Sequence, residues 1–202
     1  MLTTRRSLLS LVATGTMLGA LSAHAEDPTR TDRTDRIVGS ADAKTTVIEC
    51  FSLTCSHCAA FAKETLPQVK TELIATGKIR YQFLDFPLNG LDFIAFQVTR
   101  YMPTERYMPF VEALLATQDR WAFARGINPT EELWKMAALA GMSRTTFDKA
   151  VADTALKTWI AEQQDVASKR WKVDSTPTFI VNGAVHAGQM SFDAFRKLIP
   201  ES

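Results

Sequence analysis

The chain has 202 residues, of which 46% are hydrophobic and 22% are charged, and its formal net charge is +1. This length and composition suit one globular domain, or one domain that carries an insertion, with enough apolar residues for a substantial core. A near-neutral chain without a long run of basic residues gives no support for nucleic-acid binding. The chain has three cysteines, so at most one disulfide can form within it and one cysteine is left over.

Residues 1–25 have the features of an export signal. Arg5 and Arg6 give a positive start, residues 8–21 are mostly apolar, and residues 23–25 (AHA) fit an A-x-A cleavage site. The apolar stretch is short for a membrane anchor, which is the alternative. The paired arginines leave the Sec and twin-arginine routes both open. We therefore predict that the mature protein works outside the cytoplasm, where disulfides persist.

The mature chain is expected to start with a flexible leader, residues 26–36, because this stretch is polar and repeats a Thr-Asp-Arg triplet. Ile37 and Val38 then form a short edge strand. Residues 47–51 (VIECF) are largely apolar and partly β-branched, which predicts a strand covered on both faces. Cys50 lies in this strand, and we interpret it as a buried, inert thiol; a role in a second redox step is the alternative.

The sequence Cys55-Ser56-His57-Cys58 follows this strand and opens the next helix. A thiolate at a helix N-terminus faces free backbone N–H groups and the positive end of the helix dipole, which lower its pKa. Cys58, one turn later, can close a disulfide with Cys55 or resolve a mixed one. His57 can add a positive charge and a donor beside the first sulfur. We predict a redox-active pair, with a structural disulfide or a metal site as alternatives; c-type haem attachment would need His where Ala59 stands.

The helix that Cys55 opens is expected to end before Gly77, a natural C-terminal residue. Pro67 lies inside it and removes one backbone hydrogen bond, so we expect a kink near residues 63–65. A second strand follows over residues 79–86.

Residues 91–171 show no strand signals and instead carry apolar residues at helical spacing. This predicts a block of helices. They are expected to begin near Leu91, at about residue 108 (ending near 118, with Pro109 in the first turn), after Asn128, after Ser143 and after Asp153.

Strand character returns at residues 178–181. Asn182-Gly183 predicts a tight hairpin turn into residues 184–186, and Ser191 is placed to cap a last helix.

Placing the strands before and after the helical block in one sheet gives an α/β protein with a thioredoxin-like fold, in which helices flank a central mixed sheet. We therefore predict a thioredoxin-like domain made of residues 37–90 and 172–202. Residues 91–171 form an all-helical inserted domain.

Two motifs of this chain resemble those of the DsbA-like thiol:disulfide oxidoreductases of the bacterial periplasm. The first is the CSHC motif at the head of a helix, and the second is residues 175–179 (STPTF) before the hairpin. Both motifs, in this order around a helical block and behind an export signal, are quite specific. The resemblance covers most of residues 37–199.

The resemblance implies a role for several residues. Cys55 is the attacked cysteine and Cys58 the buried, resolving one. Thr176-Pro177 is the loop that faces the sulfurs, with Pro177 in the cis form. Glu49 falls on the buried acidic position of the family, where it helps to move a proton on or off Cys58. Its apolar neighbours independently favour burial and a raised pKa, and a solvent-exposed strand-edge residue is the alternative.

This chain departs from the family pattern in two ways. Many oxidases of this type have Pro where this chain has Ser56, and the residues between the cysteines tune thiolate stability, whereas keeping His57 favours an oxidant. Some relatives carry a second disulfide in the insertion. Its ends would fall near Tyr101 and Ala150, and neither is Cys here, so that bridge cannot form.

The predicted function is a protein disulfide oxidase that donates its Cys55–Cys58 disulfide to reduced, exported proteins in the periplasm. We expect a monomer that needs no cofactor and no metal. The resemblance implies reoxidation by a DsbB-like, quinone-linked membrane partner. A disulfide isomerase or reductase on the same fold is the first alternative. A metal-handling protein is the second, because thiolates suit Cu(I) or Zn, although His57 and His186 leave too few ligands for a ready four-ligand site.

Overall fold

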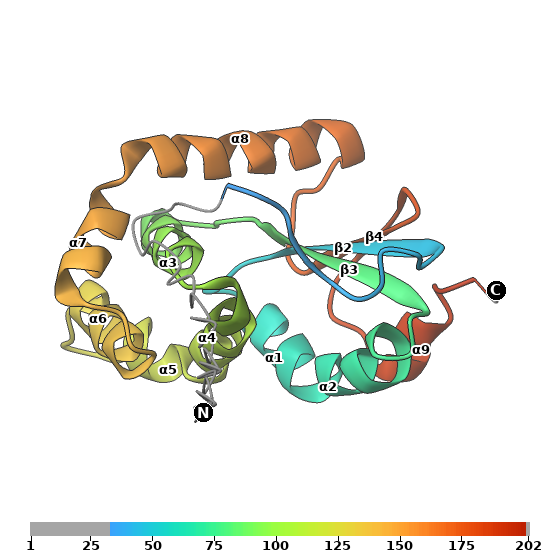
Figure 1. Cartoon of the computed structure of the whole chain (residues 1–202), viewed down its shortest axis with the longest axis horizontal. Coiled ribbons are helices and arrows are strands. Elements are labelled where there is room, and N and C mark those ends of the chain that lie inside the picture. The colour runs from blue at the N-terminus through green and yellow to red at the C-terminus, as the bar shows by residue number, and fades with distance from the viewer. Residues whose placement is uncertain (1–32, 201–202) are drawn as a thin grey trace, which may run out of the picture.

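The computed structural model describes residues 33–200 and places a mixed sheet between layers of helices (Figure 1). The strand order is β1-β3-β2-β4-β5. At the centre, β2 (Thr45–Phe51) and β3 (Ile79–Asp85) run parallel. The other pairings are antiparallel, and the remaining strands are β1 (Arg36–Val38), β4 (Thr178–Val181) and β5 (Ala184–Ala187).

Two helical layers and a helical block surround this sheet (Figure 1). One layer contains α1 (Ser56–Glu64), α2 (Leu66–Val69), the π-helical turn η1 (Lys70–Ile74) and α9 (Phe192–Arg196). The opposite layer is α8 (Thr154–Trp171). The block contains α3 (Gly90–Arg100), α4 (Thr104–Ala116), α5 (Gln118–Trp121), α6 (Pro129–Leu139) and α7 (Arg144–Ala152). Within residues 33–200, no helix is both long enough and apolar enough to cross a bilayer.

This is the predicted architecture: a central mixed sheet flanked by helices, with a helical segment between β3 and β4. The predicted export signal lies outside the described residues, as do residues 26–32 of the predicted leader. The end of that leader differs from the prediction. Arg36 begins β1 and is 4% exposed, because its side chain lies over the ring of Tyr107 at 4.5 Å.

The two faces of the sheet belong to two separate hydrophobic clusters. Side chains alternate between the faces along a strand, so Val47 and Phe51 of β2 pack into the large cluster that includes α1, while Cys50 packs into a small one with Ala167 of α8. In β4, Phe179 and Ile180 divide in the same way. The position of a residue in β2 therefore decides which helical layer it meets.

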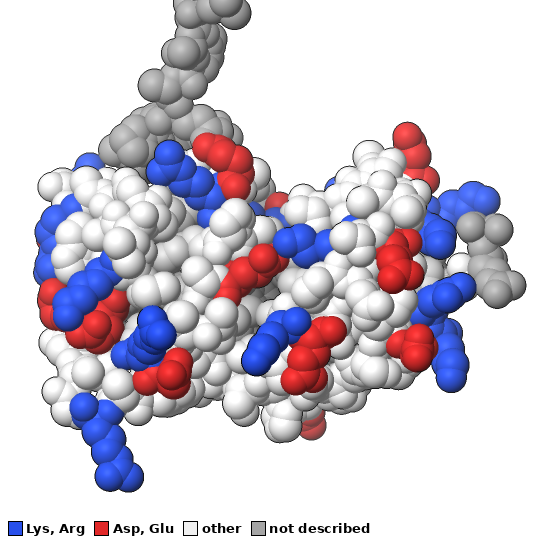
Figure 2. Space-filling model, turned by 90° about the horizontal axis from the view of Figure 1, so that it is seen from below, with Lys and Arg blue, Asp and Glu red and all other residues white. Residues whose placement is uncertain are grey.

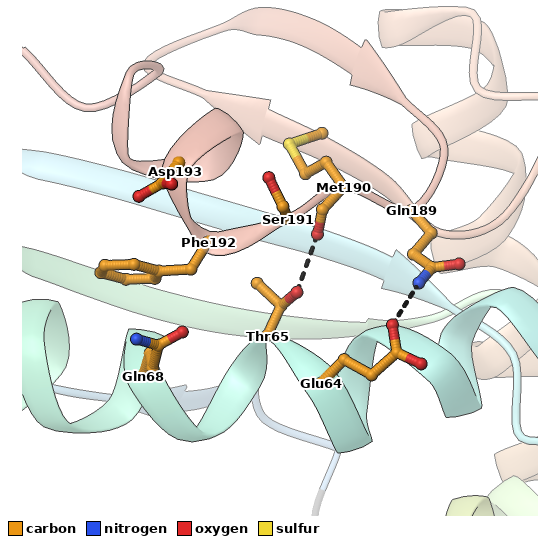
Figure 3. A pocket seen from close by; sticks show the side chains of 8 residues that line it. All are labelled: Glu64, Thr65, Gln68, Gln189, Met190, Ser191, Phe192 and Asp193. Atoms are coloured by element: carbon orange, nitrogen blue, oxygen red, sulfur yellow. Dashed lines mark hydrogen bonds between the residues drawn. The ribbon is translucent and has the colours of Figure 1, made fainter.

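The long helix predicted after Cys55 is interrupted at Thr65, which confirms the expected kink. Pro67 has no N–H to donate to the preceding turn, and α1 ends one residue before Thr65. The Thr65 hydroxyl donates to the Met190 carbonyl (2.8 Å), and Gln189 Nε2 donates to Glu64 Oε2 (3.0 Å), as Figure 3 shows. These contacts line a surface hollow of about 470 Å³ at the far end of α1 from Cys55. The break is thus held in place by the segment before α9.

The helix starts predicted from capping residues are confirmed. Asn128, Ser143, Asp153 and Ser191 each accept a hydrogen bond from a backbone N–H in the first turn of the helix that follows. Such caps satisfy donors that have no partner inside the helix.

The hairpin at Asn182-Gly183 is also confirmed, with φ angles of +47° and +91°.

The prediction for residues 108–118 is wrong in its boundaries. The helix α4 begins at Thr104 and ends at Ala116, so Pro109 lies inside it rather than in its first turn, and α5 is a separate short helix. The prediction assumed that proline limits where a helix can begin. Burial of one helical face outweighs the lost hydrogen bond. The buried side chains of α4 are Tyr107, Phe110, Val111, Leu114 and Leu115.

A buried ion pair joins the sheet to the helical block. Arg100, at the end of α3, donates through Nε to Asp85 Oδ2 at the end of β3 (2.7 Å), and their side chains are 2% and 1% exposed. The Tyr107 hydroxyl donates to the other oxygen of Asp85 (3.3 Å). The carboxylate therefore links β3, α3 and α4.

We predict that Asp85→Asn destabilises the protein by about 3 kcal/mol, because it leaves a buried guanidinium without its carboxylate. Chemical denaturation measures this loss. Asp165→Asn is the matched control, since its pair with Lys169 is exposed and should contribute less than about 1 kcal/mol. Equal effects of the two substitutions would contradict the proposed link.

Candidate active site

The two cysteines of the CSHC motif occupy different environments at the start of α1. Cys55 is the N-cap residue, with an extended backbone (φ −91°, ψ 121°), and its carbonyl accepts from the Ala59 N–H (3.1 Å). Cys58 lies in the first turn. Both are free thiols in this structure, with Cys55 9% and Cys58 1% exposed. Cys55 is therefore the more accessible sulfur, in agreement with the family resemblance.

Hydrogen bonds to the Cys55 sulfur stabilise its thiolate. A hydrogen bond from the Cys58 thiol is the largest cause, and the backbone N–H groups of Cys58 and His57 add to it. Burial acts in the opposite direction, and the net result lowers the pKa of Cys55 to about 5. At neutral pH this group is a thiolate, the form that attacks disulfides and leaves readily.

Cys58 has the opposite tendency. Burial is the main cause that raises its pKa well above the usual range, and the bond that it donates to Cys55 adds to this. The backbone N–H of Ser52 donates to Cys58 Sγ (3.5 Å) and lowers the pKa in part. At neutral pH one sulfur of the pair is charged and the other protonated, which gives them distinct chemical roles.

The second motif lies beside the first. The Thr176–Pro177 peptide bond is cis, and the Cys55 thiol donates to the Thr176 carbonyl oxygen (3.3 Å). The loop is held at its other end by Gly188, whose N–H donates to the Pro177 carbonyl (2.8 Å). The cis bond and the position of the loop against Cys55 agree with what the family resemblance implied.

Glu49 is buried, as its apolar neighbours in the sequence predicted. It is 4% exposed and accepts a hydrogen bond from the Tyr81 hydroxyl (2.8 Å). Burial raises the pKa of Glu49 to about 7, opposed by the bond from Tyr81 and assisted by the charge of Cys55. The Glu49 charge also raises the pKa of Cys58, so the carboxyl and that sulfur are electrostatically coupled. Glu49 can therefore hold or release a proton near neutral pH.

Cys50 belongs to the other face of the sheet. It follows Glu49 in β2 and packs under α8, whereas Cys58 packs in the large cluster. Burial raises the pKa of Cys50 to about 12. This position agrees with a buried, inert thiol.

Ser56 and His57 are exposed between the two cysteines. The backbone N–H of His57 is among the groups that lower the pKa of Cys55, and the role of its ring charge stays a prediction. In residues 33–200, no three or more His, Cys, Asp or Glu side chains are grouped so that they could hold a metal ion.

The sequence did not identify two side chains of the helical block that reach the turn before Cys55. Asp92 of α3 accepts from the Leu53 N–H (3.0 Å), and Gln118 of α5 donates to the carbonyls of Leu53 (2.8 Å) and Cys55 (3.0 Å). Tyr81, the partner of Glu49, was missed as well. All three lie far along the chain from the motif, and the sequence carries no local signal for such contacts.

We predict that Cys58→Ala raises the pKa of Cys55 above about 5, because the strongest hydrogen bond to the thiolate is lost. Cys58→Ser retains a donor and should give a smaller rise. The ultraviolet absorbance of the thiolate, followed against pH, measures both. An unchanged pKa in Cys58→Ala would contradict a contribution from the Cys58 thiol.

Glu49→Gln should change how stability depends on pH. Between pH 4.5 and about 7 the unfolded chain has lost the Glu49 proton that the native state retains, so native stability falls as pH rises through this window. The amide of Glu49→Gln does not titrate, so the stability of the variant does not fall in this way. We expect the variant to gain on the order of 3 kcal/mol over the wild type between pH 4 and pH 8.

Denaturation of the reduced proteins across this pH range measures the difference. Glu162→Gln, which replaces an exposed carboxyl on α8, controls for the loss of one negative charge. A difference between wild type and Glu49→Gln that stays constant with pH would show that this carboxyl does not titrate in the native protein.

Comparison with known proteins identifies the family. A family model described as "Thioredoxin" matches residues 31–201. A Rickettsia bellii protein named "Putative protein-disulfide oxidoreductase" is 29% identical over 153 residues, which are 75% of this chain and 58% of that protein. The chain thus spans about six-tenths of the length of this curated relative.

Solved structures show the same fold. The crystal structure of Wolbachia pipientis alpha-DsbA1 matches with a TM-score of 0.76 and 27% identity, covering 82% of this chain and 89% of that one. Oxidised BdbD from Bacillus subtilis matches with a TM-score of 0.71 and 19% identity, covering 82% and 90%. The resemblance to DsbA proteins and the thioredoxin-like fold with a helical insertion are thereby confirmed, and the chain belongs to the thioredoxin family.

Proposed function

We propose that this protein is a thiol:disulfide oxidoreductase that donates a Cys55–Cys58 disulfide to reduced, exported proteins. One observation carries the proposal: the environment lowers the pKa of Cys55 to about 5 and raises that of Cys58. A thiolate that is stable in the reduced protein makes the reduced form favourable, so the disulfide is a strong oxidant. The names of the relatives support the same class of reaction.

The reaction follows from the two sulfurs. A substrate thiolate attacks Cys55 Sγ, a sulfur–sulfur bond forms there, and the Cys55–Cys58 bond breaks with its electron pair on Cys58. Cys58 then takes up a proton, for which the Glu49 carboxyl is a nearby source. A second substrate thiolate attacks the substrate sulfur of the mixed disulfide, and Cys55 leaves as its stable thiolate. The substrate gains a disulfide and the protein carries two electrons away.

The loop beside Cys55 and the charge distribution of one face of the molecule bear on how substrates are selected. The Thr176–Pro177 loop borders Cys55, so a chain joined to that sulfur must lie against this loop. Lys and Arg are interspersed with Asp and Glu on the face shown in Figure 2, between broad uncharged areas. That face carries no single-sign field that would select partners by net charge.

The setting proposed for this activity is the periplasm, reached by either export route. The sequence features of residues 1–25 and the DsbA-like relatives support it. Reoxidation is assigned to a DsbB-like membrane protein that passes electrons to quinone, and the working form to a monomer without cofactor. An isomerase or reductase is the second candidate, favoured by Ser56 in place of the proline of many oxidases, because this residue tunes thiolate stability.

The reduction potential of the Cys55–Cys58 couple tests the proposal. We expect a value near about −120 mV for the mature protein from Glu26, equilibrated with glutathione. A value of about −200 mV or below would contradict a dedicated oxidase and favour the second candidate.

Variants of the two cysteines test the order of the steps. Cys58→Ser should accumulate mixed disulfides with a reduced, unfolded protein, because the attacked sulfur remains and its resolving partner is missing. Cys55→Ser should not. Non-reducing electrophoresis after acid quenching separates the species, and trapping by Cys55→Ser alone would reverse the assignment.

A further inference from the structure

The turn between β2 and α1 is bound to the helical block by one buried carboxylate. Asp92, in the first turn of α3, is 0% exposed. Its Oδ2 accepts from the Ser52 hydroxyl (2.6 Å) and the Leu88 N–H (2.9 Å), and its Oδ1 accepts from the Leu53 N–H (3.0 Å). Three donors from two separate segments therefore converge on this side chain.

Capping α3 does not explain this burial. Asn89 already caps the helix, because its side chain accepts from the Asp92 N–H (3.0 Å). Burial raises the pKa of Asp92 to about 6, against the effect of the donors. Burying a carboxyl group costs free energy. Capping a helix does not require that cost, because an exposed polar side chain can cap a helix equally well. The carboxylate instead accepts hydrogen bonds from Ser52 and Leu53 in the turn between β2 and α1.

Ser52 connects this carboxylate to the redox pair. Its side chain binds Asp92, and its own backbone N–H donates to Cys58 Sγ (3.5 Å). Ser52 is 0% exposed, and its hydroxyl also accepts from the Thr54 N–H (3.1 Å). Asn89 Nδ2 donates to the Thr54 hydroxyl (2.9 Å), which closes the network. The orientation of the Ser52 peptide is thereby fixed from the insertion side.

We propose that Asp92 is a positioning residue for opening the disulfide, because it holds Ser52 so that the Ser52 N–H faces the Cys58 sulfur. This inference rests on the proposed function and adds a residue to its site. When a thiolate attacks Cys55, the breaking bond leaves its electron pair on Cys58 in a buried position. The Ser52 N–H is a fixed donor at the place where that charge develops. Cys58 is afterwards protonated.

A positioning role and a structural one make different predictions. In the resting reduced protein Cys58 is a thiol, so its thiolate exists only while the disulfide opens or closes. Loss of Asp92 should therefore slow both directions and leave the equilibrium between them nearly unchanged. General loosening of the site would instead disturb the Cys55 thiolate, and with it the reduction potential.

The experiment measures opening of the oxidised, full-length mature protein by a small thiol, dithiothreitol, in stopped flow. For Asp92→Asn we expect the second-order rate constant to fall about tenfold, equivalent to about 1.4 kcal/mol, with the potential against glutathione unchanged. Asparagine keeps the size of the side chain but directs an N–H donor at groups that are themselves donors. Ser52→Ala removes only the hydroxyl and should also slow opening.

The double variant tests whether the two residues act together. Because Asp92 is inferred to act through Ser52, the combined substitution should slow opening no more than Asp92→Asn alone. Asp153→Asn is the matched control: Asp153 caps α8 and accepts from the Leu156 N–H (2.8 Å) and the Tyr101 hydroxyl (3.1 Å), away from the turn. Its rate of opening should equal that of the wild type.

Three results would overturn the inference: an unchanged rate in Asp92→Asn, effects of Asp92→Asn and Ser52→Ala that multiply, or equal slowing in Asp153→Asn. If Asp92→Asn does not fold, an unchanged rate of opening in Ser52→Ala is by itself enough to overturn the inference. These rates are obtained with a small thiol, so they remain valid if the wild-type potential contradicts the oxidase proposal. A failure of the function and a failure of this inference are therefore distinguishable.

Discussion

The chemistry of this site depends on hydrogen bonding to one sulfur at the point where α1 begins. Cys55 is the N-cap residue, and the Cys58 thiol together with backbone N–H groups of the first turn stabilises its thiolate. These backbone N–H groups are available because the first N–H groups of a helix have no acceptor within the helix. Moving the helix start by one residue would place Cys55 inside the helix and change its partners. The turn of residues 52–54, which precedes that start, is held by Asp92, Asn89 and Gln118 of the helical block and the residues before it.

Two buried carboxyl groups approach the pair from different parts of the fold. Glu49 comes from the sheet, where the alternation of β2 aims it toward α1, and Asp92 comes from the helical block. Burial raises the pKa of each, but their partners differ. Glu49 accepts a hydrogen bond from Tyr81 and is electrostatically coupled to Cys58, which suits a group that exchanges a proton. The Asp92 side chain accepts from Ser52, Leu53 and Leu88, which suits a group that stays ionised and holds the turn.

The sequence predicted those parts of the structure that have local causes. The CSHC helix start, the kink before Pro67 and the hairpin at Asn182-Gly183 each depend on neighbours within a few residues, and all three are confirmed. Contacts between distant segments could not be predicted in this way. The bond from Tyr81 to Glu49 depends on strand register, and the early start of α4 depends on tertiary burial of its apolar face. The strand of Tyr81 was predicted, but nothing in the sequence indicated its partner.

The helical block also forms hydrogen bonds to the turn that precedes the redox pair. Asp92 and Gln118 belong to α3 and α5, and between them they bind both the N–H and the carbonyl of Leu53. The position of α3 is in turn fixed to the sheet by the buried pair of Arg100 and Asp85. The same helix thus anchors to β3 at its C-terminal end and to the active-site turn at its N-terminal end. The ion pair and the active-site turn are therefore connected through one helix of eleven residues.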